Sequence, residues 1–274
     1  MKKLFLLAII LFSFTSFNKN QLTWVAIGDS ITYLNDHQNE TGNRITKGYM
    51  TRVTEKLPNI HFINQGHNGW TSGNIASAID KLGLTKADIY SVFLGTNDWW
   101  HGRKLGTFKD YVDNTGNETV YGSFRIIINK IRGLNREAKI ILITPMQRSD
   151  FVYINNPKNN AYGSYREKNG QSLEQFVYVV DSIATYEHCY LVDLYHKKGM
   201  DVKHLVKFKR LKDPKTGTYT NFPFPGYIDI PYDPEKDEYP YPVDAIDVTY
   251  DGLHPSDKGY EMISKSLVKI MKKF

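Results

Sequence analysis

The chain has 274 residues, of which 41% are hydrophobic and 23% are charged, so it can form one large domain with a full core and is not globally disordered. Its formal charge of +6 falls to +4 when Lys2 and Lys3, which belong to a predicted signal peptide, are left out. The other lysines are spread along the chain and accompany no nucleic-acid-binding motif, so we expect no nucleic-acid partner. A weak attraction to acidic glycans or membrane surfaces is compatible with this charge.

The N-terminus has the pattern of a secretory signal peptide. Met1-Lys2-Lys3 is followed by an apolar run from Leu4 to Phe14. This run is too short for a transmembrane helix and no other long apolar stretch follows, so we expect no stable membrane insertion. We predict a signal peptide at residues 1–20 and one secreted or periplasmic domain at residues 21–274. The single cysteine, Cys189, lies in a short apolar run and is interpreted as a buried core residue.

Apolar runs then alternate with segments of helical periodicity. The predicted strands are residues 24–27, 60–64, 88–94, 139–144 and 190–194, and the predicted helices are residues 47–57, 74–82, 119–134, 172–186 and 255–272. This alternation is typical of a parallel sheet with helices on both faces. We therefore expect an α/β fold, a three-layer α/β/α sandwich with a flavodoxin-like parallel sheet of about five strands in the order 2-1-3-4-5.

Residues 199–250 break the alternation. Seven of the eleven prolines fall between Pro214 and Pro242, with tyrosines and phenylalanines between them. A long irregular segment inside a compact domain is usually a functional loop or a disordered linker, and the aromatic residues argue against disorder. We interpret it as an ordered Tyr/Pro-rich insertion. Its C-terminal part should lie beside Asp251, and its rings should form a wall that stacks on sugars; a dimer interface or a core cover is the competing interpretation.

The first predicted strand ends in Gly28-Asp29-Ser30. Glycine allows a sharp turn there, and the turn would expose the Ser30 hydroxyl at the end of a buried strand. A serine in this position can act as a nucleophile if a base and an oxyanion site lie nearby. Taken alone, the tripeptide is more typical of a turn or a helix N-cap than of a nucleophile.

Two further residues follow the next predicted strands. Gly69 comes after the second strand and Asn97 after the third, and ligands of open α/β sheets bind beyond the carboxyl ends of strands. The Gly69 backbone N–H, the Asn97 amide and the Ser30 backbone N–H would together make an oxyanion hole. Taken singly, Asn97 also fits a turn and Gly69 a helix start.

A base is predicted near the C-terminus, where Asp251 precedes His254 by three residues and Pro255 follows. Within one turn the Asp251 carboxylate can accept a hydrogen bond from the imidazole, which leaves the other ring nitrogen for the serine. The alternatives are an Asp/His cap of the last helix and a metal site. The other seven histidines show no compact ligand spacing, so no metal is predicted.

At this point the sequence resembles the SGNH (GDSL-type) hydrolases. Four blocks match in order: Gly28-Asp29-Ser30, Asn64 to Gly69, Gly95-Thr96-Asn97-Asp98, and Asp251 to His254-Pro255. The resemblance extends from Trp24 to the C-terminus, apart from the insertion. It implies Ser30 as nucleophile, His254 as base and Asp251 as its partner. It also implies oxyanion donors at Ser30, Gly69 and Asn97, the fold expected above, and esterase activity without a cofactor.

The substrate side is less defined. Three of the four tryptophans, Trp70, Trp99 and Trp100, lie near these blocks and suit either sugar stacking or core packing. Gln147 and Arg148 follow the fourth predicted strand and could bind a polar or anionic group of the substrate, although a surface salt bridge also suits Arg148. His67 could touch substrate or be structural.

Together these residues predict a secreted serine esterase that removes acetyl or other short acyl groups from a small-molecule or glycan ester, through an acyl-enzyme. Two alternatives stay open. One is a lysophospholipase or thioesterase that acts on longer acyl chains, and the other is a non-catalytic carbohydrate-binding protein on the same fold.

Overall fold

The computed structural model describes residues 20–274, so the predicted signal peptide lies outside the described residues except for its last position. A five-stranded parallel sheet forms its centre, in the order β2-β1-β3-β4-β7. The strands are β1 (Leu22–Gly28), β2 (Ile60–Gly66), β3 (Ile89–Phe93), β4 (Lys139–Ile143) and β7 (Tyr190–Val192). Because β7 is the fifth strand of this sheet along the chain, the predicted order is confirmed.

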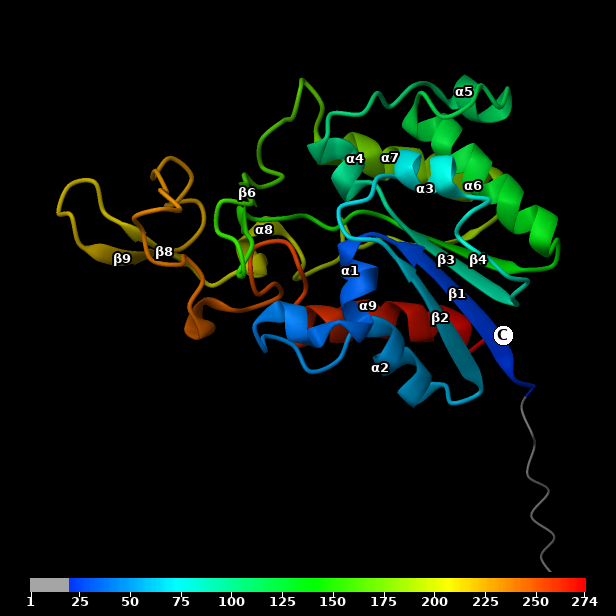
Figure 1. The fold of residues 1–274 in the computed structure, drawn as a ribbon, viewed down its shortest axis with the longest axis horizontal. Coiled ribbons are helices and arrows are strands. Elements are labelled where there is room, and N and C mark those ends of the chain that lie inside the picture. The colour runs from blue at the N-terminus through cyan, green and yellow to red at the C-terminus, as the bar shows by residue number, and fades with distance from the viewer. Residues whose placement is uncertain (1–19) are drawn as a thin grey trace, which may run out of the picture.

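Two cores lie on opposite faces of the sheet, because successive side chains of a strand point to opposite sides. In β1, Val25 and Ile27 enter one core, whereas Trp24 and Ala26 enter the other. The first core is covered by α3 (Ser72–Ala78), α6 (Val120–Leu134) and α7 (Leu173–Tyr186), and the second by α2 (Tyr49–Lys56) and α9 (Asp257–Met271). Figure 1 shows these helices on the two sides of the sheet, which confirms the three-layer sandwich.

The longer helices begin where the sequence supplies a capping side chain. The Thr119 hydroxyl accepts a hydrogen bond from Gly122 N–H at the start of α6, and Ser256 does the same for Gly259 at the start of α9. Single-turn helices give no periodic signal and were not predicted from the sequence. They are α1 (Ser30–Tyr33), α4 (Thr96–Trp100), α5 (Phe108–Val112) and α8 (Val202–Leu205), with 3₁₀ turns η1 (Leu34–Asp36), η2 (Gln38–Thr41) and η3 (Val243–Ala245).

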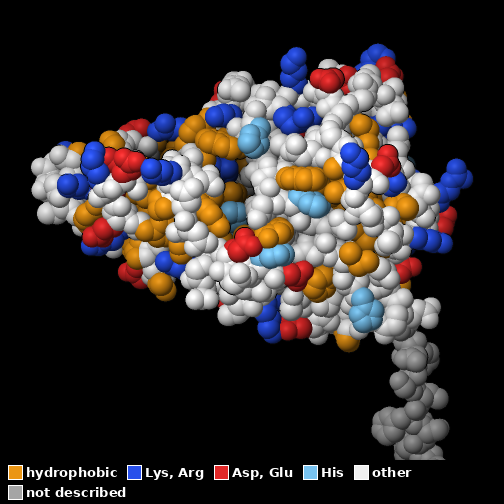
Figure 2. All heavy atoms as spheres, viewed as in Figure 1, with side chains coloured by type: hydrophobic (Ala, Val, Ile, Leu, Met, Phe, Trp, Pro, Cys, Tyr) orange, Lys and Arg blue, Asp and Glu red, His pale blue; other side chains and the backbone are white. Residues whose placement is uncertain are grey.

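Two small antiparallel hairpins were also missed from the sequence. One pairs β5 (Phe151–Val152) with β6 (Asn160–Ala161), and the other pairs β8 (Lys209–Lys212) with β9 (Tyr219–Phe222) inside the insertion. Figure 1 shows the insertion projecting beyond the end of the sheet that carries α1. On the face shown in Figure 2, basic and acidic side chains are interspersed and form no patch of one sign.

Two further features bear on the expectations from sequence. No helix in the described part of the chain is both long and apolar enough to span a bilayer. Cys189 was predicted to be a buried core residue, but it is only half-buried and packs at the edge of the first core. Burial raises the pKa of its thiol to about 11, so the thiol is un-ionised at neutral pH.

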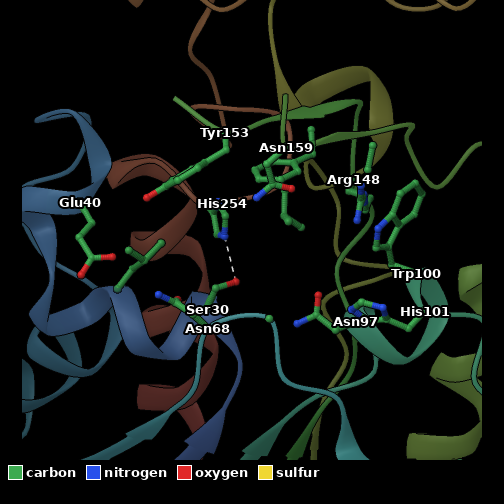
Figure 3. A pocket seen from close by; sticks show the side chains of 15 residues that line it. Ser30, Glu40, Asn68, Asn97, Trp100, His101, Arg148, Tyr153, Asn159 and His254 are labelled. Atoms are coloured by element: carbon green, nitrogen blue, oxygen red, sulfur yellow. Dashed lines mark hydrogen bonds between the residues drawn. The ribbon is translucent and has the colours of Figure 1, made fainter. Parts of the chain in front are cut away.

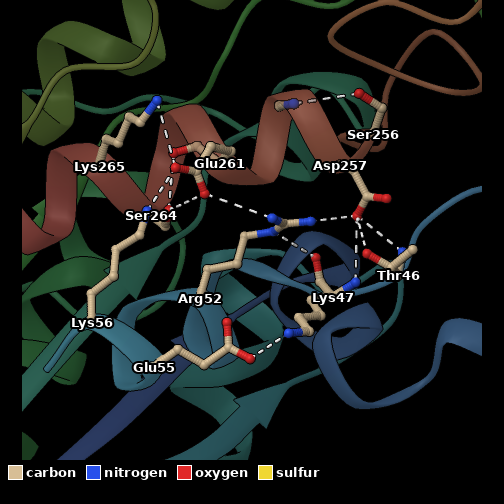
Figure 4. A network of polar contacts seen from close by, with 11 residues as sticks. Thr46, Lys47, Arg52, Glu55, Lys56, Ser256, Asp257, Glu261, Ser264 and Lys265 are labelled. Carbon is tan, nitrogen blue, oxygen red and sulfur yellow. Dashed lines mark hydrogen bonds and ion pairs between the residues drawn. The ribbon is translucent and has the colours of Figure 1, made fainter. Parts of the chain in front are cut away.

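A polar network joins the two helices that cover the second core (Figure 4). The half-buried Arg52 of α2 pairs with Asp257 and Glu261 of α9. Asp257 also accepts hydrogen bonds from the backbone N–H groups of Thr46 and Lys47. Its carboxylate lies in the first turn of α9, where the helix dipole favours negative charge.

We expect Arg52→Met to lower the free energy of unfolding by about 1–2 kcal/mol, because Arg52 serves two carboxylates at a half-buried site. The matched control is Lys47→Met, which removes an exposed ion pair with Glu55 and should cost less than about 0.5 kcal/mol. Urea unfolding of both variants measures the difference. Equal losses would show that the network adds nothing beyond a surface ion pair.

Candidate active site

The register of the sheet brings the predicted site residues to one edge. Gly28 at the end of β1 pairs with Gly66 of β2 and with Phe93 of β3, so all three strands end level with one another. Ser30, Gly69 and Asn97 leave this edge within four residues of the paired positions. Three segments that are far apart in sequence therefore lie together at this edge of the sheet.

Ser30 is the first residue of α1. The Asp29 side chain caps this helix by accepting a hydrogen bond from Ile31 N–H at 3.0 Å. The Tyr260 hydroxyl of α9 donates to the Ile31 carbonyl at 3.0 Å and ties the single turn to the second core. The turn thus has support on both sides of Ser30, although one turn alone is not stable in water.

His254 and Asp251 complete a hydrogen-bonded chain with Ser30. The Nε2 atom of His254 lies 2.9 Å from the Ser30 Oγ, and its Nδ1 atom lies 2.7 Å from the Asp251 Oδ2. The other carboxylate oxygen of Asp251 accepts the backbone N–H groups of Leu253 and His254. Asp251 is completely buried and His254 is 6% exposed, so the pair has little contact with solvent. In this geometry the imidazole can take a proton from the hydroxyl.

The loop that carries Asp251 and His254 packs against the segment before β5. Gly252 has a φ of +90°, and a Cβ atom there would lie 1.8 Å from the Asp150 carbonyl oxygen, so only glycine fits. Ser149 N–H donates to the Gly252 carbonyl at 2.9 Å, and Val152 N–H donates to the Asp251 carbonyl at 3.1 Å. This contact fixes the position of the loop relative to β5.

Aromatic rings hold the imidazole of His254 on two sides. Tyr250 stacks on it with centroids 5.9 Å apart, and Phe151 of β5 meets it edge-on at 5.4 Å. These contacts restrict rotation of the ring and exclude water from its faces. Tyr250 is the last residue of the insertion, which places the end of that segment directly against His254.

Three N–H donors lie near Ser30. Gly69 has a φ of +72° and lines the cavity over Ser30, and a Cβ atom there would meet nothing within 4 Å. The Asn97 Nδ2 donates one hydrogen to the Trp70 carbonyl at 3.0 Å, which orients the amide and leaves its second hydrogen free to point elsewhere. Figure 3 shows the Asn97 amide nitrogen on the side of Ser30. With the Ser30 N–H, these groups can serve a developing oxyanion.

A cavity of about 380 Å³ opens over Ser30 (Figure 3). It is lined by six of the predicted residues together with side chains that the sequence analysis did not identify. The lining is Ser30, Leu34, Glu40, Asn68, Gly69, Asn97, Trp100, His101, Arg148, Phe151, Tyr153, Asn159, Ala161, Leu253 and His254, among which Trp100 and Arg148 were predicted to contact substrate. This volume suits a small ligand or the end of a larger one.

Several substrate-side predictions need correction. Trp99 is completely buried, donates its indole N–H to the Gln171 carbonyl and does not line the cavity, so it is a core residue. Gln147 bonds the Tyr195 carbonyl and the Val202 N–H through its two amide atoms, which makes it a structural bridge. His67 and Trp70 stack on each other outside the cavity lining.

The predicted aromatic wall is also wrong in its location. No residue of the insertion lines the cavity over Ser30, and the wall comes from β5, β6 and the loop between them. Phe151, Tyr153, Asn159 and Ala161 occupy this hairpin. The pattern Phe-Val-Tyr-Ile followed by Asn-Asn-Pro is a hairpin signal that could have identified the segment in the sequence.

Two other buried carboxyl groups lie next to the site and take no part in the hydrogen bonds that join Ser30, His254 and Asp251. Burial raises the pKa of Asp29 from its usual 3.8 to about 6, although the hydrogen bond from Ile31 and the nearby His254 act in the opposite direction. Burial also raises the pKa of Asp98, against hydrogen bonds from Ser72 and the charge of Arg103. Within residues 20–274, no three His, Cys, Asp or Glu side chains are grouped to hold a metal ion.

Comparison of the chain with known proteins gives a match to one family. The model of the GDSL-like lipase/acylhydrolase family matches residues 26–262. The crystal structure of a possible lipase from Chitinophaga pinensis DSM 2588 is 63% identical to this chain, with a TM-score of 0.91, and the match covers 92% of this chain and 98% of that one.

More distant solved structures are similar in fold alone. A lipase/acylhydrolase from Enterococcus faecalis is 19% identical with a TM-score of 0.51, covering 92% of this chain and 96% of its own. Axe2, an acetylxylan esterase from Geobacillus stearothermophilus, is 18% identical with a TM-score of 0.51, covering 91% and 94%. No curated protein matches the sequence.

The raised pKa of Asp29 predicts a pH-dependent stability. Between about pH 4 and pH 6 the folded state keeps a proton on Asp29 that the unfolded state has lost, so the free energy of unfolding contributed by this group falls as pH rises through that window. We expect Asp29→Asn to gain stability relative to wild type by about 2–3 kcal/mol between pH 4 and pH 7. Urea unfolding of both proteins across this range measures it. A difference that does not change with pH would mean that Asp29 ionises normally in the folded protein.

Proposed function

This chain belongs to the GDSL-like lipase/acylhydrolase family, and from that premise we propose that it is a secreted or periplasmic serine esterase that removes acetyl or other short acyl groups from carbohydrate. Membership of this family supports hydrolysis of ester bonds. The observation that carries the proposal is the hydrogen-bonded chain from Ser30 through His254 to Asp251, at 2.9 and 2.7 Å. Export is proposed from the charged and apolar N-terminal pattern, residues 1–20.

In the proposed mechanism the Ser30 Oγ attacks the ester carbonyl carbon while His254 Nε2 takes its proton. Asp251 holds the imidazole in the required tautomer and stabilises the imidazolium. The tetrahedral oxyanion receives hydrogen bonds from the Ser30 and Gly69 N–H groups and from Asn97 Nδ2. When the intermediate collapses, His254 gives the proton to the leaving alcohol, and an acyl-enzyme remains. Water then attacks the acyl-enzyme carbonyl carbon while His254 takes one of its protons, and the new oxyanion uses the same donors. When this intermediate collapses, the bond to Ser30 Oγ breaks, His254 returns the proton to Ser30 Oγ, and the acid is released.

The cavity over Ser30 supports a short acyl group. Its lining mixes apolar residues with the polar side chains of Glu40, Asn68, Asn97, His101 and Asn159. A long acyl chain would have to cover these polar groups and leave them without hydrogen bonds. The rival is activity on longer chains, which the similarity to a possible lipase favours. A series of 4-nitrophenyl esters separates the two, since kcat/KM should be highest for acetate and should fall with chain length.

A carbohydrate is supported by aromatic and polar groups in two adjoining cavities. Trp100 offers a ring in the lining of the cavity over Ser30, and a second cavity of about 250 Å³ shares Phe151 and Ala161 with the first. The insertion contributes Lys209, Ile228, Ile230 and Tyr232 to this second cavity, which Tyr162 and Tyr165 also line. Rings with polar tips suit sugar rings, which present apolar faces and hydroxyl edges. A glycan whose ester lies at Ser30 can therefore extend over β5 and β6 into the second cavity.

We expect Ser30→Ala to lower kcat/KM for 4-nitrophenyl acetate by about 10⁴-fold or more, because the nucleophile is removed while the fold keeps its core. The matched control is Ser266→Ala on α9, which should leave activity unchanged. A fluorophosphonate probe should label wild type and Ser266→Ala but not Ser30→Ala. A protein that is neither labelled nor active would favour the non-catalytic carbohydrate-binding alternative.

We expect Tyr232→Phe to raise KM for an acetylated oligosaccharide by about 3- to 10-fold and to leave 4-nitrophenyl acetate unaffected. The Tyr232 hydroxyl is buried beside the second cavity and has no hydrogen-bond partner in the described chain, so a sugar hydroxyl can supply one. The control is Tyr219→Phe, since the Tyr219 hydroxyl bonds Asp237 within the insertion and lines neither cavity. Unchanged KM values for Tyr232→Phe on both substrates would argue against glycan binding there.

A further inference from the structure

Arg148 places a buried positive charge in the wall of the cavity over Ser30. The residue is 1% exposed, and its Nε and Nη2 atoms are buried without a hydrogen-bond partner within residues 20–274. The guanidinium lies over the rings of Trp99 and Trp100, with its Cζ atom 5.4 and 5.0 Å from their centroids. Aromatic faces attract a cation, but they do not replace an oxygen acceptor for its N–H groups.

No other arginine in the described chain combines such burial with the lack of an acceptor. Every half-buried arginine donates to a carboxylate or a backbone carbonyl: Arg44, Arg52, Arg103, Arg125, Arg132 and Arg210. The buried Lys209 pairs with Asp150 at 2.8 Å. Buried charges in proteins are normally paired, because an unpaired one loses its hydration without compensation.

The charge of Arg148 persists at neutral pH. Burial lowers the pKa of its guanidinium to about 10, with Asp150 and Asp251 acting in the opposite direction, so the group is protonated at pH 7. The cavity is therefore electrically asymmetric. Figure 3 shows Arg148 beside Trp100 and His101 on one side, and Glu40 on the opposite side.

We propose that Arg148 binds a carboxylate of the substrate, so that the preferred substrate is an ester of an acidic molecule. The planar guanidinium matches a carboxylate in charge and in fork geometry, and the Trp99 and Trp100 rings hold its plane. The carboxylate belongs either to the alcohol, as in an acylated uronic acid, or to the acyl group, as in a dicarboxylic half-ester. This inference rests on the proposed function and narrows its substrate class.

Two other roles for Arg148 make different predictions. A purely structural cation between aromatic rings would affect stability and would treat charged and neutral substrates alike. A charge that stabilises the oxyanion would change kcat for every ester by a similar factor. Only binding of a substrate carboxylate makes the effect depend on the charge of the substrate.

The test uses matched pairs of substrates that differ in one carboxylate. The alcohol pair is an O-acetylated methyl glucuronide and the corresponding methyl glucoside, and the acyl pair is 4-nitrophenyl hemisuccinate and 4-nitrophenyl butyrate. We expect wild type to prefer the charged member of one pair by about 10- to 100-fold in kcat/KM, the range for one charge-assisted contact. The pair that shows the preference identifies the part of the substrate that carries the carboxylate.

Arg148→Met should bring kcat/KM for the charged substrate down to that for its neutral partner, and Arg148→Lys should keep part of the preference because the charge is kept and the fork is lost. The matched control is Arg125→Met on α6. Arg125 also lies over an aromatic ring, that of Tyr111, but it pairs with Glu187 away from the cavity. The Arg125→Met variant should keep the wild-type preference for the charged substrate even if its free energy of unfolding falls.

A binding measurement separates failure of this inference from failure of the proposed function. Calorimetry with Ser30→Ala protein compares glucuronate with glucose and succinate with succinamide, and requires no catalysis. A preference for the charged ligand that is lost in Ser30→Ala/Arg148→Met supports the inference even if wild type hydrolyses nothing. Hydrolysis of neutral esters without preference for either charged substrate overturns the inference and leaves the esterase proposal intact. An equal loss on all substrates in Arg148→Met also overturns it.

Discussion

The buried carboxylate of Asp251 is the constraint on which the arrangement of the site depends. A fully buried negative charge is tolerated only when its oxygens are satisfied, and here three N–H groups of its own turn satisfy them: two from the backbone and one from His254. These bonds fix the imidazole with its second nitrogen toward Ser30. The positive φ of Gly252 brings the same turn against the segment before β5, so the turn, Phe151 and the cavity wall form one packed unit.

The site divides into parts with different structural origins. The serine and the two donors from Gly69 and Asn97 come from the aligned strand ends of the sheet, where register alone brings them together. The wall of the cavity comes from the β5–β6 hairpin, and the second cavity comes from that hairpin and the insertion. The nucleophile and its oxyanion donors thus depend on the sheet, whereas the proposed substrate selection depends on segments added beyond its carboxyl edge.

The two buried basic residues near the site are held in different ways. Lys209 pairs with Asp150, so its charge is neutralised and stabilises the junction between the insertion and β5. Arg148, two residues before Asp150, has aromatic rings for neighbours, and its Nε and Nη2 atoms have no acceptor among the described residues. Burying the charge costs a similar free energy for both side chains. An anionic ligand therefore stabilises the unpaired Arg148 more than it would stabilise Lys209, which already has a partner.

By itself the sequence determined the order of the sheet, its two covering layers and the segments that carry Ser30, Gly69, Asn97, Asp251 and His254, because strand and helix periodicities and strand-end motifs are local signals. It could not determine that Trp99 is a core residue and Trp100 a cavity residue, since adjacent helical positions differ only in the direction they face. Nor could the sequence identify the β5–β6 hairpin as the wall of the cavity over Ser30, because its strands have only two residues each. It also could not show that the insertion lines the second cavity and not the first. Only the tertiary structure decided that Arg148 is buried without an acceptor for its Nε and Nη2 atoms within residues 20–274, because burial and pairing depend on segments distant in the chain.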